Sequence, residues 1–261
     1  MKKKITMPGL RKFNLIMAGL HALQALAVYL IADPTKGIFP VNTSYLTLKP
    51  GSTEQNPVLV SASSTIFNVN LATLVIIFLV LSSLAHLFIA TVYRKKYESD
   101  LKKGINKVRW YEYSLSASTM LVAIALLTGI YDIGALIMIF GLTAIMNLMG
   151  LAMEVYNQGR EKVSWLAYNI GCLAGIIPWI VIGMMFWAGN KYGVGDPPTF
   201  VYFIYVSLFL FFNCFAINMV LQYKKIGKWE NYLYGERAYI ILSLLAKSAL
   251  AWQVFAGTLR P

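Results

Sequence analysis

The sequence predicts an all-α membrane protein, a bundle of seven transmembrane helices with its N-terminus in the cytoplasm and a short β-hairpin in the first extracellular loop. Of the 261 residues, 58% are hydrophobic and only 13% are charged, against about a quarter in an ordinary soluble domain. The apolar residues gather in charge-poor stretches of about 20, the length that crosses about 30 Å of hydrocarbon. Lys and Arg gather between those stretches. These observations exclude a disordered chain, a nucleic-acid-binding domain and a disulfide scaffold.

Seven apolar stretches follow one another within a single domain, residues 1–261. Because backbone polar groups in lipid must be hydrogen-bonded within the protein, we interpret each stretch as a helix. Gly129, Asp132 and Gly134 interrupt the longest apolar run and predict a tight turn near Asp132, between the third helix and the fourth. The seven predicted helices are 13–32, 66–93, 111–131, 133–153, 163–188, 200–221 and 238–259.

The only long connection is the first loop, residues 33–65. Two runs of β-forming residues, 45–48 and 58–60, lie on either side of Pro50 and Gly51. A Pro-Gly turn between such runs predicts a small hairpin on the membrane surface.

Lys and Arg outside the predicted helices are divided unevenly between the two sides of the membrane. Eighteen lie on the side of the N-terminus and four on the other side. The positive-inside rule then places the N-terminus in the cytoplasm and the C-terminus outside the cell. Attraction between this basic face and anionic membrane lipid accounts for the net charge of +12, so we expect no nucleic-acid partner.

Four histidine, acidic or basic side chains, His21, His86, Glu112 and Lys247, lie within the apolar stretches. A central Lys costs about 2.5–3.5 kcal/mol on insertion scales, so Lys247 must be neutralised or covalently bonded. It is a candidate Schiff-base or ion-pathway lysine, and the alternative is a structural ion pair.

Glu112 is the only carboxylate that we expect to pair with Lys247. Asp132, Glu154 and Glu236 lie near helix ends, where acids are common and carry little information. Hydropathy places Glu112 near the inner end of its helix, at a shallower depth in the membrane than Lys247, which lies near the middle of the seventh helix. For the two to meet, the third helix must begin earlier, within residues 103–107, or tilt inward.

Small polar side chains lie one helical turn from each of these four groups, which predicts polar stripes around an internal hydrated cavity. The pairs are Ser243 with Lys247, Ser116 with Glu112, Ser82 with His86, and Gln24 with His21. A single membrane His is more often structural than a ligand. Two could bind zinc, but no third ligand is evident and we expect no metal site. Cys172 and Cys214 lie inside apolar runs and are expected to be buried.

Two motifs together resemble the heliorhodopsin family. They are Arg109-Trp110-Tyr111-Glu112-Tyr113-Ser114-Leu115-Ser116 in the third helix and Ser243-Leu244-Leu245-Ala246-Lys247-Ser248 in the seventh. The cytoplasmic N-terminus supports the resemblance, because heliorhodopsins are inverted relative to ordinary microbial rhodopsins. The resemblance covers essentially the whole chain.

The resemblance implies that Lys247 binds retinal, all-trans in the dark, as a protonated Schiff base with Glu112 as its single counterion. Ser243 then stands where pumping rhodopsins keep a second carboxylate, and Ser116 lies nearby. A polar, proton-accepting cavity on the cytoplasmic side would contain His21, Gln24, Ser82, His86 and Arg109. Trp179, beside Pro178, and Phe212 are the expected walls of the chromophore pocket. We also expect a homodimer in the membrane.

The sequence argues against a proton pump. Ala123 occupies the place, eleven residues after Glu112, where a pump would carry a proton donor, and no acid lies in the interior of the fourth to sixth helices. No hydrolase or nucleotide-binding motif is present, so we expect a sensory photoreceptor, not an enzyme, with a signalling partner still to be identified. One alternative is a light-gated or passive ion (proton) conductor. Another is a non-retinal transporter or membrane-enzyme subunit in which Lys247 is a substrate counter-ion.

Overall fold

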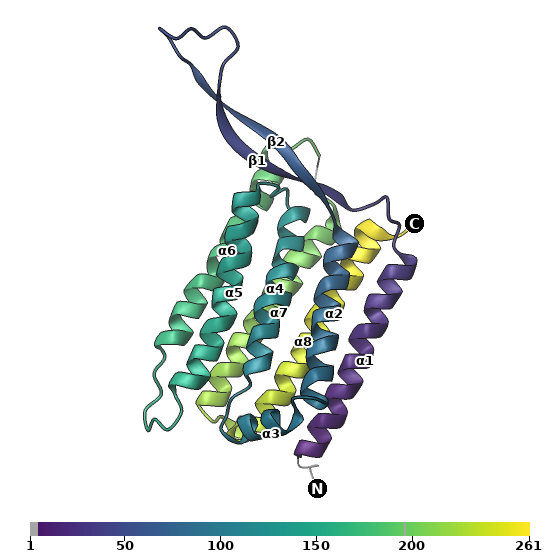
Figure 1. The fold of residues 1–261 in the computed structure, drawn as a ribbon, viewed down its shortest axis with the longest axis vertical. Helices are drawn as coiled ribbons and strands as arrows, with labels where there is room; N and C mark the ends of the chain where they lie inside the picture. Colours follow the sequence, from purple (N-terminus) through teal and green to yellow (C-terminus); the bar gives the residue numbers. More distant parts are fainter. Residues whose placement is uncertain (1–4, 196) are drawn as a thin grey trace.

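The computed structural model describes residues 5–195 and 197–261. Within them, six helices are long and apolar enough to cross a membrane. They are α1 (Met7–Ile31), α2 (Leu71–Ala90), α5 (Ile133–Tyr156), α6 (Leu166–Tyr192), α7 (Thr199–Tyr223) and α8 (Tyr232–Val254), which continues as a π-helical turn to Leu259. A seventh, α4 (Lys107–Leu127), is more polar and runs through the same bundle (Figure 1). The predicted helical bundle is confirmed.

The two ends of the bundle differ. The N-terminus lies at the end that also carries α3 (Arg94–Lys102), and we call this the N-terminal end. The C-terminus and the hairpin lie at the opposite end, the hairpin end (Figure 1). The sequence reading missed α3, because a nine-residue polar helix has no apolar stretch to reveal it.

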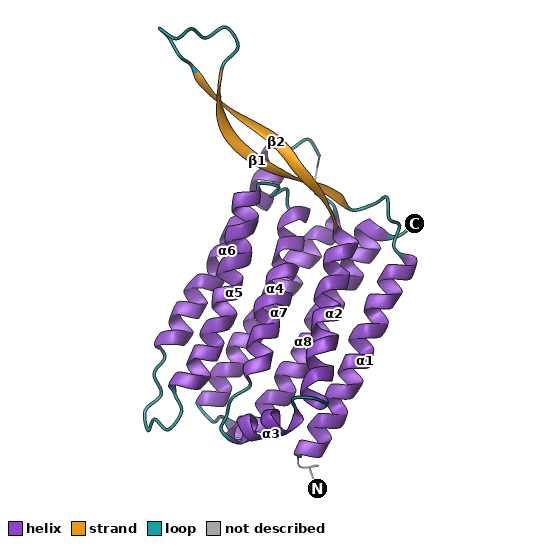
Figure 2. Cartoon of the chain, in the orientation of Figure 1, coloured by secondary structure: helices purple, strands orange, loops and turns teal. Residues whose placement is uncertain are grey.

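The hairpin is longer than predicted and projects beyond the bundle (Figure 2). Its strands, β1 (Ile38–Leu48) and β2 (Leu59–Asn70), pair antiparallel along their whole length. Residues 66–70 therefore belong to β2, and the prediction that the second helix begins at 66 is wrong. The Asn70 side chain accepts the Ala72 N–H at 2.8 Å and starts α2.

Polar N-caps account for two other helix starts that differ from prediction. The Asn106 side chain accepts the Arg109 N–H at 3.1 Å, so α4 begins at Lys107 rather than at 111. The Asn231 side chain accepts the Leu233 N–H at 3.0 Å, so α8 begins six residues before the predicted 238. An N-cap satisfies backbone donors that an apolar-stretch criterion ignores.

The turn between α4 and α5 forms where predicted, around Asp132. The Asp132 carboxylate accepts the N–H groups of Gly134 and Ala135 at 2.9 and 3.2 Å and caps α5. It also accepts the Ser44 hydroxyl at 2.8 Å, and the Asn42 N–H donates to the Tyr131 carbonyl at 2.8 Å. Strand β1 is thereby tied to this turn at two points.

Helix packing brings α4 to the middle of the bundle, between α2 and α5. The adjacent pairs are α1 with α2, α5 with α6, and α7 with α8. Gly150 of α5 permits one close approach, because a Cβ built there would lie 2.4 Å from the Trp110 ring. The absence of a side chain at Gly150 thus seats Trp110 of α4 against α5.

Candidate functional site

Lys247 lies in the middle of α8 and is almost completely buried. Its Nζ atom is 3.2 Å from Glu112 Oε1 and donates to Ser243 Oγ at 2.8 Å. The Ser82 hydroxyl donates to the same Glu112 oxygen at 2.6 Å. The structure therefore brings together four predicted site residues from α2, α4 and α8.

The difference in depth between Glu112 and Lys247 has a structural explanation. Helix α4 begins at Lys107, at the edge of the range expected for a meeting. Side chains on a helix tilt toward its N-terminus, so the long Lys247 side chain reaches back to Ser243, one turn nearer the N-terminal end.

The ion pair is buried on both sides, with exposed side-chain fractions of 4% for Lys247 and 8% for Glu112. Removing one partner of such a pair leaves an uncompensated charge and typically costs about 3–5 kcal/mol. Each member of the pair therefore holds the other in place.

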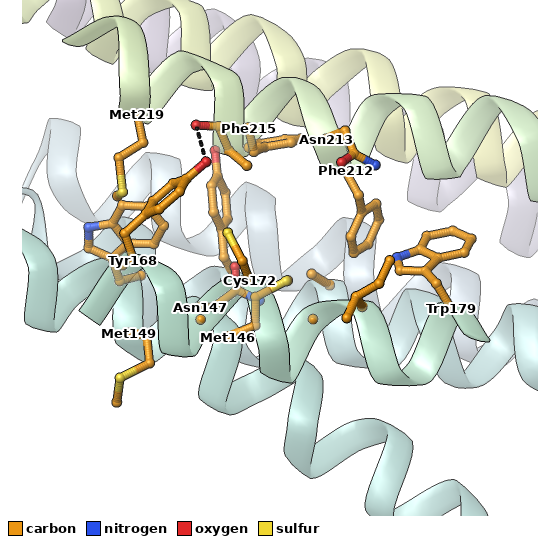
Figure 3. A pocket seen from close by; sticks show the side chains of 18 of the residues that line it. Met146, Asn147, Met149, Tyr168, Cys172, Trp179, Phe212, Asn213, Phe215 and Met219 are labelled. Carbon is orange, nitrogen blue, oxygen red and sulfur yellow. Dashed lines mark hydrogen bonds between the residues drawn. The ribbon is translucent and has the colours of Figure 1, made fainter. Parts of the chain in front are cut away.

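A cavity of about 470 Å³ opens beside Lys247 and runs between α4, α5, α6, α7 and α8. Its walls are mostly apolar and aromatic. Trp179 and Phe212 lie at one end, with ring centroids 5.4 Å apart, and Tyr168 and Met219 lie at the other (Figure 3). Its size is within the usual range for a small-molecule site, in which few polar groups fix the orientation of the ligand. Lys247 and Ser243 line the cavity, so the residues fit a long apolar ligand held at one amine.

His21 of α1 and His86 of α2 lie together on the α1–α2 side of the ion pair. Their rings stack in parallel, with centroids 5.6 Å apart and an angle of 7° between planes. His86 Nδ1 is 2.7 Å from Asn14 Oδ1. Among the described residues, neither ring nitrogen of His21 has a hydrogen-bond partner, although both are buried. Ser82, one turn before His86, connects this region to Glu112.

Comparison with known proteins decides the family. The sequence matches the heliorhodopsin family over residues 10–259. The chain belongs to the heliorhodopsin family. No curated protein matches it. Family membership implies a multi-pass, retinal-binding photoreceptor, in a family that is generally non-enzymatic.

Three of the predicted site residues lie away from the ion pair or lack contact with it. The half-buried Gln24 accepts the Trp252 indole N–H at 3.1 Å and so lies on the contact between α1 and α8. The Ser116 hydroxyl is buried one turn beyond Glu112 and has no hydrogen-bond partner among the described residues. Arg109 lies in a separate cluster toward the N-terminal end.

This Arg109 cluster consists of Arg109, Glu154 and Glu236. The Arg109 guanidinium forms an ion pair with each carboxylate, and all three side chains are at least 96% buried. The view that Glu154 and Glu236 are uninformative helix-end acids is wrong. Their positions near helix ends are visible in the sequence, but the packing of α3 and the start of α4 over them is not.

Several residues of the pocket wall were not predicted from the sequence, and Cys172 lies in a different environment from the one predicted. Trp110, Tyr113, Ala117 and Met120 recur at helical spacing along the pocket face of α4, and that periodicity was the available signal. Cys172, expected to be buried, is exposed on α6 and also lines the cavity. The described residues contain no group of three His, Cys, Asp or Glu side chains that could hold a metal.

Proposed function

We propose that this protein senses light through retinal attached to Lys247 Nζ, with Glu112 as the counterion. The observation that carries the proposal is that one buried amine both lines the apolar cavity and pairs with a single buried carboxylate. Bound retinal supplies absorption of visible light and a change of shape, and the all-trans form in the dark is what the family implies.

The side chains around Lys247 have distinct roles in this proposal. Glu112 stabilises positive charge at the Lys247 nitrogen, while Ser82 and Ser243 orient the two charged groups through hydrogen bonds. Trp179, Phe212 and the other aromatic walls exclude water and confine the ligand. His21 and His86 supply ring nitrogens on the α1–α2 side of the ion pair that can accept a proton released from Lys247.

A sensory role without pumping is supported by the distribution of acids. Ala123, at the place of a pump's donor, is fully buried among apolar residues. In the described part of α5, α6 and α7, Glu154 is the one acid, and Arg109 already pairs with it. Between the ion pair and the hairpin end, the core around α4 is hydrophobic. Within the described residues, a proton leaving Lys247 would find hydroxyl groups such as Ser116 toward the hairpin end, but histidine side chains only on the α1–α2 side.

The orientation follows from charge. We propose that the N-terminal end, with its excess of Lys and Arg, faces the cytoplasm, and that the hairpin end faces outward. A light-gated or passive proton conductor is the second candidate, favoured by the line of polar side chains from Glu112 through Ser82 toward His86. The homodimer and the signalling partner stay predictions.

One spectroscopic experiment tests the proposed function. Purified protein is mixed with all-trans retinal, reduced with borohydride, and digested for mass spectrometry. We expect a visible absorption band and a retinyl group on the peptide that contains Lys247. A colourless protein would instead support the transporter or enzyme-subunit reading. A photocurrent in voltage-clamped cells would support the conductor.

A further inference from the structure

A file of buried hydrogen bonds leads from the histidine pair to the Arg109 cluster. His86 Nδ1 is 2.7 Å from Asn14 Oδ1, Asn14 Nδ2 is 3.4 Å from the Tyr97 hydroxyl, and that hydroxyl is 3.0 Å from Glu236 Oε1. The four side chains come from α2, α1, α3 and α8. Asn14, Tyr97 and Glu236 are all at least 96% buried, so water has little access to the file.

The orientation of the Asn14 amide is fixed by the backbone. Asn14 Nδ2 donates to the Leu10 carbonyl at 3.0 Å, and a carbonyl oxygen can only accept. The amide nitrogen therefore faces Leu10 and Tyr97, and the amide oxygen faces His86. An amide oxygen is also only an acceptor, so His86 Nδ1 must carry a hydrogen. In a neutral ring the free lone pair is then on Nε2.

Each link of the file donates in the same direction, toward Glu236. Burial and the adjacent Glu236 carboxylate raise the pKa of Tyr97 well above its usual range, so its hydroxyl remains a donor. Asn106 Nδ2 and Arg109 also donate to Glu236. Glu154 accepts from Arg109, the Trp110 indole, the Tyr232 hydroxyl and the Asn106 N–H.

When both carboxylates are ionised, the Arg109 cluster carries a net negative charge. Every hydrogen-bond partner of the two carboxylates, within the described chain, is a donor, which is the environment of an ionised acid. One guanidinium then faces two carboxylates. A negative charge at the end of an aligned hydrogen-bond file stabilises positive charge at its beginning.

We propose that Asn14 is a positioning residue that holds His86 in the Nδ1–H tautomer, and that Tyr97 couples His86 to the Arg109 cluster and to α3. The inference rests on the proposed function for its light-driven part. In the light-driven part, the proton leaves the Lys247 nitrogen and binds to His86 Nε2. The His86 ring is then a cation, and its Nδ1–H still donates to Asn14. Lys247, Glu112 and His21 are the titratable groups that face His86 from α8, α4 and α1, and the file is its link to the N-terminal end.

The tautomer can be measured in the dark, without retinal. The chain has two histidines, so ¹⁵N-histidine NMR of the full-length protein above neutral pH gives two ring systems, and a His86→Phe variant identifies the signals of His86. We expect a protonated Nδ1 and an unprotonated Nε2. In Asn14→Leu that preference should disappear. In Asn14→Asp, which keeps an acceptor oxygen toward His86, Nδ1 should remain protonated.

Tyr97→Phe is the matched variant for the second half of the file. It removes the hydroxyl that joins Asn14 to Glu236 but leaves the bond from Asn14 to Leu10, so the Nδ1–H tautomer of His86 should be retained. With retinal bound, hydrogen exchange of α3 should differ between dark and illuminated wild-type protein, and this difference should be lost in Tyr97→Phe while the dark absorption band is unchanged.

Three results would overturn the proposal. One is a wild-type His86 protonated on Nε2, another is an unchanged tautomer in Asn14→Leu, and the third is an α3 that responds to light equally with and without the Tyr97 hydroxyl. A protein that takes up no retinal would refute the proposed function, whereas the dark NMR spectrum would still decide the tautomer.

Discussion

The indole nitrogen of Trp110 donates a hydrogen bond of 2.6 Å to Glu154 Oε2, so one side chain belongs both to the pocket wall and to the surroundings of the Arg109 cluster. Gly150 fixes its position, because a Cβ there would overlap the indole ring. The shape of the pocket and the geometry of the buried charges are therefore coupled through a single ring.

Gly150→Ala tests this coupling. The added methyl group must displace the Trp110 ring, so we expect a loss of about 1–3 kcal/mol in unfolding free energy and a shifted absorption maximum of the retinal complex. Gly141→Ala is the matched control in the same helix, because a Cβ there meets no atom within 4 Å. Thermal unfolding and absorption spectra measure both effects. Equal behaviour of the two variants would contradict the role of Trp110.

Lys247→Ala should abolish the chromophore, since no other amine lines the cavity among the described residues. It also leaves Glu112 without its partner, so we expect a loss of up to about 3–5 kcal/mol in stability. Lys247→Arg keeps a positive charge but forms no bond with retinal, and should be colourless yet close to wild type in unfolding temperature. A visible band in either variant would show that retinal is attached elsewhere.

Glu112→Gln keeps the size of the side chain and removes the anion beside the Lys247 nitrogen. At an effective dielectric constant near 20, charges about 4 Å apart interact by about 4 kcal/mol, which corresponds to roughly a thousandfold change in proton occupancy. With retinal bound, the variant should absorb in the near-ultraviolet at neutral pH and recover visible colour in acid, or else shift to the red. An absorption titration that matches wild type would mean that another group balances the charge.

The orientation of the chain can be tested on intact cells. Because the N-terminal end carries the excess of Lys and Arg, an epitope tag after Pro261 should be accessible to antibody without permeabilisation. A tag before Met1 should become accessible only after permeabilisation and serves as the internal control. The reverse result would place the hairpin end in the cytoplasm.

Illuminated cells that contain the protein should show no sustained change of external pH. Ala123 and the hydrophobic core around it offer no exit for a proton toward the hairpin end. The measurement is made with and without a protonophore, and a known light-driven proton pump expressed in the same cells gives the positive control. A steady, protonophore-sensitive signal would reveal a proton path through groups such as His21 and His86.

Much of the fold is predictable from the sequence because apolar length is a local property. The prediction from apolar length fails where one apolar stretch spans two elements: residues 66–70 adjoin the apolar residues of α2 but pair as part of β2. It also fails for α3, whose nine residues bury only Tyr97, Asp100 and Leu101. Local sequence patterns do not predict the role of a residue when that role depends on packing against distant parts of the chain.

The same limit applies to the site. Lys247 and Glu112 stand out because an intramembrane charge is costly wherever it lies. Glu154 and Glu236 do not stand out, since their burial depends on α3 and the start of α4, which pack over them. Asn14 gives no signal at all, because its importance comes from which atom of its amide faces His86.

The hydrogen bonds from Ser44 to Asp132 and from Asn42 to Tyr131 join β1 to the turn between α4 and α5, so the hairpin moves as an arm attached to the outer end of α4. Its pivot is the bulge between Val41 and Asn42, beside the attachment to Tyr131. From there to Leu48 the arm measures roughly 20 Å at the usual rise of a strand. A tilt of a few degrees at the outer end of α4 would therefore be magnified to ångströms at the hairpin tip, outside the lipid, where an attached probe could follow it.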